Sequence, residues 1–556
     1  MQKINIKKYG SYLLFLSLSA GVLSGCTKNF EEYNTNNIGV TDEDLKLDGQ
    51  DLVLFFRQAQ MAIYNFSGGG DPNSYQVQQN LNADVFSGYF MSPTPFNSGQ
   101  NNLNYALVNG WNGEPFKVLY VNVLNSLNKL EKNELATTYP ALWGSALVVK
   151  VAAASRVTDI YGPIPYSKAG ITGDIPYDSQ ADIYTSFFSD LDASAKILQD
   201  YIANPSASPV PDKINDIDLV YKGADNTARF RNWLKLSNSL RLRLAMRIVK
   251  VNPQLAREQA EKALNPANGG VIEVNTDNFK INIPTDANFS NPLFFIAKNW
   301  EDTRINASLE SFMVGYQDPR ISRYMDKATD PAFAGQYKGI RAGADGIEKD
   351  KYKSYSSLNT TDGNPSFTAT TAPVLMTAAE IYFLRSEAAL RGWANAGGTA
   401  QSLYEKGIDL SFQQWNVSSQ LNNYIQDNTN IPVKYTDPKN TKNDAQAMTA
   451  ITIKWDESAS NEQKLERIIT QKWLAIFPEG QEAWSEYRRT GYPKIFPVVI
   501  NNSGGTISTA VQIRRLPFPQ NEYNANGAEV QKAIQLLGGA DNGGTRLWWD
   551  KAQGNF

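Results

Sequence analysis

The stretch Thr377-Ala-Ala-Glu-Ile-Tyr-Phe-Leu-Arg-Ser-Glu-Ala-Ala-Leu-Arg-Gly-Trp393 contains both the start signal and the stop signal of a helix. Thr377 stands three residues before Glu380, which is the spacing of a capping box, where two side chains bond each other's backbone N–H at a helix start. Gly392 follows the apolar residues, and glycine commonly ends helices. This stretch therefore predicts one capped helix that ends at Gly392.

Similar patterns recur along most of the chain. Over 114–132, apolar residues are spaced by three and four, which indicates an amphipathic helix. A second helix is expected over about 141–160, ending at Gly162-Pro163, and the short link between the two favours an antiparallel pair. Because several helix pairs follow one another without a clean sequence period, the pattern predicts an all-α, mainly helical fold built on degenerate helical repeats. Further helices are expected over 51–64, 181–201, 229–250, 254–264, 462–477 and 479–489.

Composition excludes several classes of enzyme. The chain has 556 residues, no histidine and one cysteine. A chain without imidazole cannot form a Ser–His–Asp triad or offer His ligands to zinc. A single cysteine cannot form an intramolecular disulfide or a CxxC pair. Catalysis would have to rest on carboxylates, Lys, Tyr or a weakly bound cation.

Charge and motifs exclude further classes. With 53 basic and 56 acidic residues the net charge is −3, which gives no sign of a nucleic-acid-binding surface, so no nucleic acid is expected as a partner. The chain contains no GxxxxGK[ST], GxGxxG or GxSxG motif. A glycosidase needs only two carboxylates, about 5 to 9.5 Å apart, and leaves no sequence signature. A carboxylate-based glycoside hydrolase thus stays an alternative, with no catalytic residue to nominate.

The N-terminus predicts a targeting segment. Three lysines among the first eight residues precede the apolar run 12–23, which is shorter than the roughly 20 residues that span a bilayer core. The run leads into Leu23-Ser-Gly-Cys26, which looks like the lipobox of bacterial lipoproteins. We expect 1–25 to be a lipoprotein signal peptide and 26–50 a tether lipidated at Cys26, the alternative being an ordinary signal peptide.

The remaining residues, 51–556, are expected to form a single helical domain with loop excursions at about 67–112, 265–310 and 417–446. The first excursion contains no Lys, Arg or Glu, and it is rich in Asn, Gln, Gly, Ser and aromatic residues. Loops of this length are usually functional or disordered, and the aromatic residues argue against disorder. We interpret this excursion as a functional loop.

The composition of this loop suits a saccharide, which has an apolar C–H face and a rim of hydroxyl groups. Aromatic rings can cover the face, and Asn, Gln or Asp can pair with the rim. The alternative, that each aromatic residue packs the loop onto the helices, stays open. No metal ligand is nominated. The candidate ligand-binding residues are Tyr89, Asn97, Tyr105 and Trp111, with Trp300 and Asp302 from another apparent loop.

Other residues are interpreted as structural. Trp393, Trp473 and Trp484 lie on or just past amphipathic helices and are expected in the core. Arg488 and Arg489 are expected to cap or bridge helices. The remaining basic cluster is expected to form a solvated or paired surface of the helix over 229–250 and consists of Arg241, Arg243 and Arg247.

Several segments carry a resemblance to a known family: CTKNFEEYNTN (26–36), RVTDIYGPIPYS (156–167), WLKLSNSLRLRLAMR (233–247), QDPR (317–320), the stretch 377–393 quoted above, KLERIITQKW (464–473) and AWSEYRRTGYP (483–493). In this order they resemble the SusD/RagB family of nutrient-binding outer-membrane lipoproteins, in particular the second SusD-like group of the Bacteroidetes. The resemblance covers nearly the whole chain after the signal peptide. It implies a SusD-like fold in which tetratricopeptide-like helix pairs support long irregular ligand-binding loops.

The resemblance also implies a function. A lipoprotein of this family is anchored in the outer membrane, faces the cell exterior, and delivers a nutrient to a SusC-like TonB-dependent transporter. The cargo is most often an oligosaccharide, and a peptide, as in the RagB branch, is an alternative that would favour a more charged loop. An adaptor that binds only the transporter is a further alternative. The resemblance implies no enzymatic activity and no cofactor besides the lipid on Cys26, while a structural cation stays open.

Overall fold

The computed structural model describes residues 49–66, 72–171, 173–285, 289–361 and 363–556. The chain divides into two units, Met1–Asp51 and Leu52–Phe556, and nearly all described residues belong to the second. The predicted signal peptide 1–25, the lipidation site Cys26 and almost all of the tether 26–50 lie outside the described residues, so these stay predictions.

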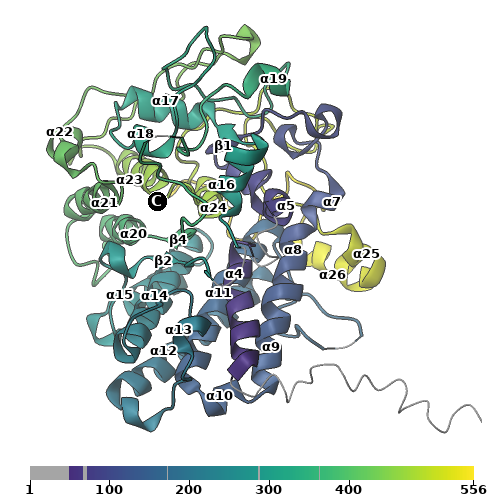
Figure 1. Ribbon diagram of the computed structural model, residues 1–556, viewed down its shortest axis with the longest axis vertical. Coiled ribbons are helices and arrows are strands. Elements are labelled where there is room, and N and C mark those ends of the chain that lie inside the picture. Colours follow the sequence, from purple (N-terminus) through teal and green to yellow (C-terminus); the bar gives the residue numbers. More distant parts are fainter. Residues whose placement is uncertain (1–48, 67–71, 172, 286–288, 362) are drawn as a thin grey trace, which may run out of the picture. The chain divides into compact units, whose positions relative to one another are not determined.

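Helices dominate the second unit, which confirms the predicted mainly helical fold (Figure 1). In its first half, long helices pack against helices that are close in the sequence: α11 against α12, α12 against α14, and α14 against α15. The helices of this half are η2 (Leu52–Phe56), α4 (Arg57–Ile63), α8 (Glu114–Val118), η6 (Leu119–Leu124), α9 (Asn125–Lys132), α10 (Leu135–Thr138), α11 (Pro140–Tyr161), α12 (Gln180–Ala203), α13 (Ile214–Ile217), α14 (Asn226–Arg247) and α15 (Pro253–Leu264).

The helix predicted over 114–132 is present as three consecutive segments, α8, η6 and α9, of which η6 has π-helical geometry. Its apolar residues at the predicted spacing are buried, among them Leu119, Val123, Leu127 and Leu130. α11 starts at Pro140 and ends before Gly162, at the predicted stop signal. The apolar spacing and the punctuating Pro and Gly residues were therefore sufficient to place these two helices.

A second group of helices packs around the quoted stretch. α20 (Ala378–Leu390) contacts α21 (Ala400–Gln414), α23 (Asn461–Ala475) and, from the first group, α14, while α24 (Gly480–Thr490) contacts α11. The capping box predicted at Thr377 forms only in part, whereas a complete one is present at the start of α23. The Ser460 side chain accepts from the Gln463 N–H and a full capping box forms at α23, whereas at α20 Thr377 accepts from the Glu380 N–H but the Glu380 carboxylate binds Arg243.

Short elements connect these helices. Strand β1 (Phe90–Met91) pairs antiparallel with β3 (Arg304–Ile305), and β2 (Phe279–Lys280) pairs with β4 (Val374–Met376). The short helices are α5 (Pro72–Tyr75), η3 (Gln76–Asn80), α6 (Ala83–Phe86), η4 (Phe96–Gly99), η5 (Asn102–Asn104), α7 (Asn109–Asn112), η7 (Pro205–Ala207), η8 (Pro266–Asn268), η9 (Asn275–Asp277), α16 (Pro292–Phe295), η10 (Ile296–Trp300), α17 (Ala307–Gly315), α18 (Ile321–Tyr324), α19 (Lys349–Tyr352), η11 (Ser418–Gln420), α22 (Leu421–Ile425), η12 (Thr441–Asn443), α25 (Gln520–Ala525) and α26 (Gly527–Leu537).

A buried network of ion pairs joins α14, α20, α23 and α24. Arg247 on α14 donates to Glu486 at 2.7 Å and to Glu482 at 2.5 Å, and Lys472 on α23 lies 3.0 Å from Glu482. Arg489 bridges Glu387 on α20 to Glu486 on its own helix. Although burial raises it, the pKa of Glu486 is held well below its ordinary value by the neighbouring Arg489, Lys472 and Arg247. The network therefore stays charged.

This network corrects one prediction and confirms another. Arg241, Arg243 and Arg247 are paired but buried, so they do not form a surface. Each finds a carboxylate on another helix, which offsets much of the cost of removing its charge from water. Arg489 bridges two helices, as predicted.

Two predicted core tryptophans are in the core. Trp484 is buried beneath the Arg488 guanidinium, 3.6 Å from the ring centroid. Trp473 is 2% exposed, and its indole N–H donates to the Ser87 carbonyl at 2.9 Å. Since Ser87 lies three residues before β1, Trp473 holds the middle of the excursion 67–112, which we call the Asn-rich loop, against α23. Trp393 is only half-buried.

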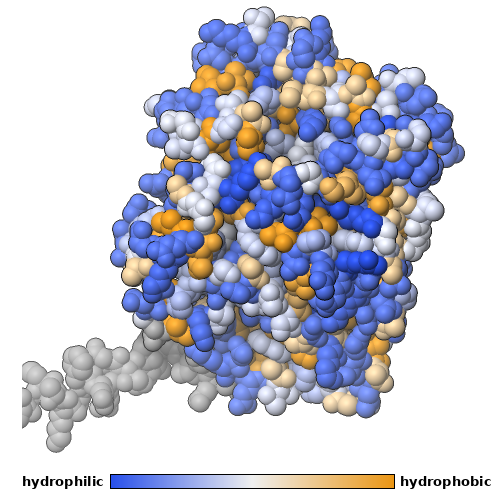
Figure 2. Space-filling view, turned by 180° about the vertical axis from the view of Figure 1, so that it is seen from behind, coloured by the Kyte–Doolittle hydropathy of each residue, from blue (hydrophilic) through white to orange (hydrophobic). Residues whose placement is uncertain are grey.

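The face of the molecule drawn in Figure 2 is mostly hydrophilic, and its hydrophobic residues form separate patches. Within the part of the chain that the structure describes, no helix combines the length and the apolar character needed to span a bilayer.

Candidate functional site

Pairing of β1 with β3 brings two predicted candidate loops together. The Thr94 hydroxyl, three residues after β1, donates to the Asp302 carboxylate at 2.5 Å. Lys349 donates to the same carboxylate at 2.8 Å and to the Trp300 carbonyl at 2.8 Å. Asp302 is therefore occupied by two protein partners, and it fixes the position of both loops.

Three candidate residues lie at the surface of this region. The ring of Trp111 packs edge-to-face against Phe96, with 5.7 Å between centroids, and it is half-buried. Asn97 is exposed, adopts a positive φ of 51°, and donates to the Gln100 carbonyl. Trp300 is half-buried against Phe295. These side chains combine partly accessible rings with an amide.

Two candidate residues, Tyr89 and Tyr105, are buried. Tyr89 is 0% exposed, its ring stacks on Trp473, and its hydroxyl donates to the Trp473 carbonyl. Tyr105 is 5% exposed and lies beside Phe86. Burial raises the pKa of both phenols. Both rings pack the loop onto the helices, which was the alternative left open for them.

A pocket without any ionisable lining residue adjoins this surface; we refer to it as the uncharged pocket. Its volume is about 290 Å³, close to the lower limit of ordinary ligand pockets. Residues 91–104 form one wall, with hydroxyl and amide groups from Thr94, Ser98 and Gln100. The opposite wall comes from the turn 343–347 and from residues 500–502, which no sequence pattern connected with the loop. The pocket can offer neutral hydrogen-bonding groups to a ligand.

A second pocket, the aromatic pocket, has a volume of about 510 Å³. It lies between α8, the loop after α11, and α25, and its lining includes the rings of Phe116 and Tyr120. The carboxylates of Glu114 and Glu522 also line it, and Glu522 accepts a hydrogen bond from Tyr177. None of these residues was predicted as a ligand contact.

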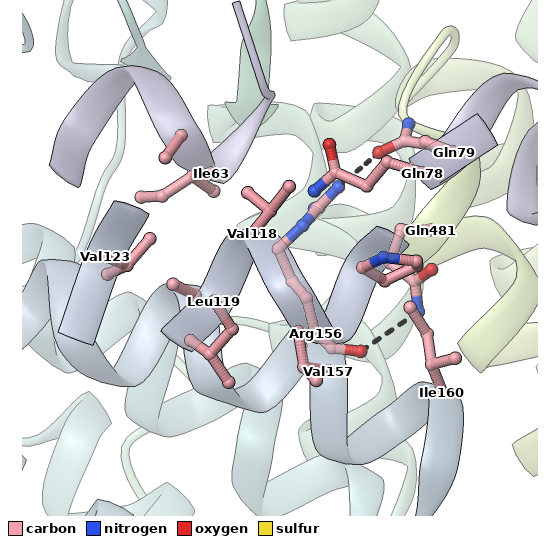
Figure 3. Close-up of a pocket in the computed structure, with 13 residues that line it drawn as sticks. Ile63, Gln78, Gln79, Val118, Leu119, Val123, Arg156, Val157, Ile160 and Gln481 are labelled. Carbon is pink, nitrogen blue, oxygen red and sulfur yellow. Dashed lines mark hydrogen bonds between the residues drawn. The ribbon is translucent and has the colours of Figure 1, made fainter. Parts of the chain in front are cut away.

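The cavity of Figure 3 is too small for a saccharide. Its volume is about 20 Å³, which is room for one water molecule. Arg156 on α11 extends along it and donates to Gln79 at 2.5 Å (Figure 3). It also donates to Glu479 at 2.8 Å. Arg156, Gln79 and Glu479 form a polar clamp, which joins the Asn-rich loop to α11 and to the residue before α24. The cavity is lined by two of these residues, Arg156 and Gln79.

Next to this clamp, Asp84 is fully buried and accepts hydrogen bonds from Tyr75, Gln79 and Asn80. Burial, together with the charge of Glu479, raises the pKa of Asp84 to about 7. An unfolded Asp titrates near 3.9, so the folded protein keeps this proton over a pH range in which the unfolded chain has released it.

Because of Asp84, stability is expected to fall as the pH rises from about 4 to 7. Each pKa unit between the folded and the unfolded value changes the free energy of unfolding by about 1.4 kcal/mol over this range. The substitution Asp84→Asn removes this titration, so its stability relative to the parent should rise over the same range in urea unfolding. Asp350→Asn is the control, because Lys353 lowers the pKa of exposed Asp350. A constant difference between Asp84→Asn and the parent would contradict the expectation.

Among the described residues, no group of three or more acidic or cysteine side chains is placed to hold a metal ion.

Comparisons with known proteins point to one family. The sequence model of the family described as "SusD-like: Susd and RagB outer membrane lipoprotein" matches residues 32–550. A solved chitin-binding SusD homologue from Flavobacterium johnsoniae is 42% identical, with 91% of this chain and 100% of that chain covered and a TM-score of 0.84.

Two further solved structures agree with this. A SusD homologue from Bacteroides vulgatus is 38% identical, with 92% and 100% of the two chains covered and a TM-score of 0.82. A SusD-like protein from Bacteroides thetaiotaomicron is 33% identical, with 91% and 100% covered and a TM-score of 0.80. No curated protein matches the chain.

Proposed function

The chain belongs to the family of Susd and RagB outer membrane lipoproteins, and from this membership we propose that it captures an oligosaccharide at the outer membrane. The observation that carries the proposal is the uncharged pocket, and the chain segment 91–104 that forms one of its walls also includes Phe96, the ring partner of Trp111. A neutral saccharide can be bound by ring faces and neutral hydrogen-bonding groups, and it does not require an ionised lining. The description of the Flavobacterium relative as chitin-binding adds support.

Each part of the proposed site has its own role. The indole of Trp111 covers the C–H face of one sugar ring. Ser98 and Gln100 pair with hydroxyl groups at the wall of the uncharged pocket. Asn97, which is exposed on the same turn, pairs with a hydroxyl group outside the pocket. Trp300 and Asp302 belong to the second loop, where Asp302 positions the loop through Thr94 and Lys349. Tyr89 and Tyr105 support the loop from below.

Delivery of the cargo completes the proposed function. The protein is anchored by lipid on Cys26, faces the cell exterior and hands the saccharide to a SusC-like TonB-dependent transporter. The full-length protein should co-purify with such a barrel from detergent-solubilised outer membranes. Cys26→Ser should release it from the membrane fraction, and retention of that variant would contradict lipidation at this residue.

Replacement of Trp111 by alanine tests the site. Trp111→Ala is expected to weaken binding of chito-oligosaccharides about tenfold or more, because an aromatic contact contributes roughly 0.5–1.5 kcal/mol beyond its buried area. Isothermal titration calorimetry measures this loss. Trp393→Ala is the matched control, since Trp393 is also half-buried but follows α20. Unchanged affinity in a folded Trp111→Ala variant would overturn the site assignment.

The remaining alternatives have separate tests. A carboxylate-based hydrolase would release new reducing ends from a bound polysaccharide, and we expect none. A pure adaptor would show no saccharide binding as an isolated protein. Tight binding of a peptide with no binding of any neutral oligosaccharide would favour the RagB-like alternative. If Glu522→Gln abolished saccharide binding while Trp111→Ala did not, the ligand would occupy the aromatic pocket.

A further inference from the structure

A third pocket lies apart from the proposed saccharide site and has a volume of about 620 Å³. Its walls come from the segment after α14, the C-terminal end of α24, residues 510–514 and the last residues of the chain. We call it the cationic pocket, because its lining includes Lys250, Arg488, Lys494, Arg514, Arg546 and Lys551. The sequence predicted no ligand contact among these residues.

Three lysines of the cationic pocket have no carboxylate oxygen within 4 Å among the described residues: Lys250, Lys494 and Lys551. The partner of Lys250 is the neutral Asn555 amide oxygen at 3.3 Å, and Lys494 lies 4.6 Å from the centroid of the Tyr492 ring. Burial, followed by the charge of Arg489, lowers the pKa of Lys250 to about 8. The pocket therefore lacks negative charge at these positions.

The arginines that line the cationic pocket also have fewer carboxylate partners than their number requires for neutrality. Arg514 and Arg546 share one carboxylate, that of Asp550, at 2.6 Å each. Arg488 donates to the backbone carbonyls of Asp159 and Arg514. Among the lining residues, Glu462 is the one carboxylate, and it accepts from Tyr492 and Asn555. Positive charge thus exceeds negative charge around the whole cavity.

We propose that the cationic pocket is a second ligand site, which binds a saccharide unit carrying an anionic group, either a carboxylate or a phosphate. An anion placed there would form charge-assisted hydrogen bonds with amines that now have neutral partners. The volume exceeds the needs of an inorganic ion and has room for a sugar ring. The cationic pocket and the uncharged pocket share no lining residue. The choice of a saccharide as ligand rests on the function proposed above, whereas the preference for an anionic group rests on the charge of this pocket alone.

Calorimetry with the full-length protein and three probes tests the proposal: a trigalacturonate, glucose 6-phosphate and neutral maltotriose. At least one acidic probe is expected to bind, with an affinity that falls as salt rises, and maltotriose is expected not to compete with it. The acidic probe that binds identifies the group as carboxylate or phosphate. Absence of binding by both, or equal displacement by maltotriose, would overturn the proposal.

Replacement of lysines in the cationic pocket tests whether the acidic probe binds there. Lys250→Met and Lys551→Met are each expected to lower the affinity for the acidic probe about tenfold. The double variant is expected to lower it further. Lys196→Met is the control, because Lys196 is an exposed lysine of α12 paired with Asp200. Trp111→Ala should leave acidic binding unchanged, which separates this site from the uncharged pocket. Unaltered affinity in the folded double variant would overturn the assignment.

Chemical labelling gives a readout that does not need a variant. With a pKa near 8, Lys250 should react with an acylating reagent at pH 8 faster than ordinary surface lysines. A bound anion covers this amine and favours its charged form, so the acidic probe should slow its acylation several-fold, as followed by mass spectrometry. Acylation of Lys196 serves as the internal control. Equal slowing of both lysines, or of neither, would contradict the proposal.

Discussion

Arg489→Met is expected to lower the free energy of unfolding by about 3–5 kcal/mol, because it removes one cationic partner from each of two buried carboxylates. Arg489 is 0% exposed. Its guanidinium donates to both Glu387 oxygens at 2.8 and 2.7 Å and to both Glu486 oxygens at 2.8 Å. Methionine fills much of the volume but supplies no donor. Urea unfolding, followed by circular dichroism, measures the loss.

The matched control is Arg257→Met on α15. Arg257 also pairs with a glutamate at 2.8 Å, but its side chain is 57% exposed, so the expected cost is below about 1 kcal/mol. The double variant Glu387→Met/Arg489→Met removes both charges and should recover part of the single-variant loss. If Arg489→Met and Arg257→Met cost the same, the buried network does not stabilise the fold in the way inferred.

Trp473→Ala is expected to cost a similar 3–5 kcal/mol, the usual range for a buried tryptophan. The substitution removes the stacking partner of Tyr89 and an edge-to-face contact with Phe312. It also removes the hydrogen bond to Ser87, so the loop that carries Phe96 and Trp111 loses one of its attachments to α23, while the bond from the Tyr89 hydroxyl to the backbone carbonyl of residue 473 can remain. Saccharide affinity should therefore fall together with stability, although Trp473 touches no ligand in the proposed site.

Trp473→Phe separates packing from hydrogen bonding. Phenylalanine keeps an aromatic ring between Tyr89 and Phe312 but leaves the Ser87 carbonyl unpaired, at a cost of about 1–3 kcal/mol. We expect this variant to retain most of the saccharide affinity. If Trp473→Phe lost as much affinity as Trp473→Ala, the hydrogen bond rather than the packing would hold the loop.

Local signals predicted the long helices well. Gly162 ends α11 as predicted, and the helix predicted over 462–477 is present as α23, because capping residues and apolar spacing act within one or two helical turns. α21 was not predicted. Its N-cap Thr399 has no Glu or Gln at the third helical position, and the preceding residues give no other strong signal.

The candidate site was predicted only in part. Tyr89 and Trp111 stand in the same uncharged loop, yet one ring packs on Trp473 and the other is half-buried at the surface. The loop has no period of 2 or 3.6, so the sequence contains no signal for the direction in which a ring points. The far wall of the uncharged pocket comes from 343–347 and 500–502, and only the fold brings these segments to the loop.

The buried ion pairs were not predicted from the sequence, for a related reason. A charged residue on a helix is ordinarily assigned to the solvated face, so Arg243 and Arg247 were placed at the surface. Their partners Glu380, Glu482 and Glu486 stand on α20 and α24, far along the chain.

That separation in sequence has a kinetic consequence. In a simple helical solenoid each repeat contacts its neighbours, and folding can spread from any point. Here Arg247 bonds Glu482 and Glu486, which are 235 and 239 residues further on. Such contacts raise the contact order, and chains with high contact order fold slowly. Arg247 also pairs with Asp159 on α11, but its two glutamate partners arrive only with α24. We therefore expect the packing of α14 to be completed only after α24 has folded.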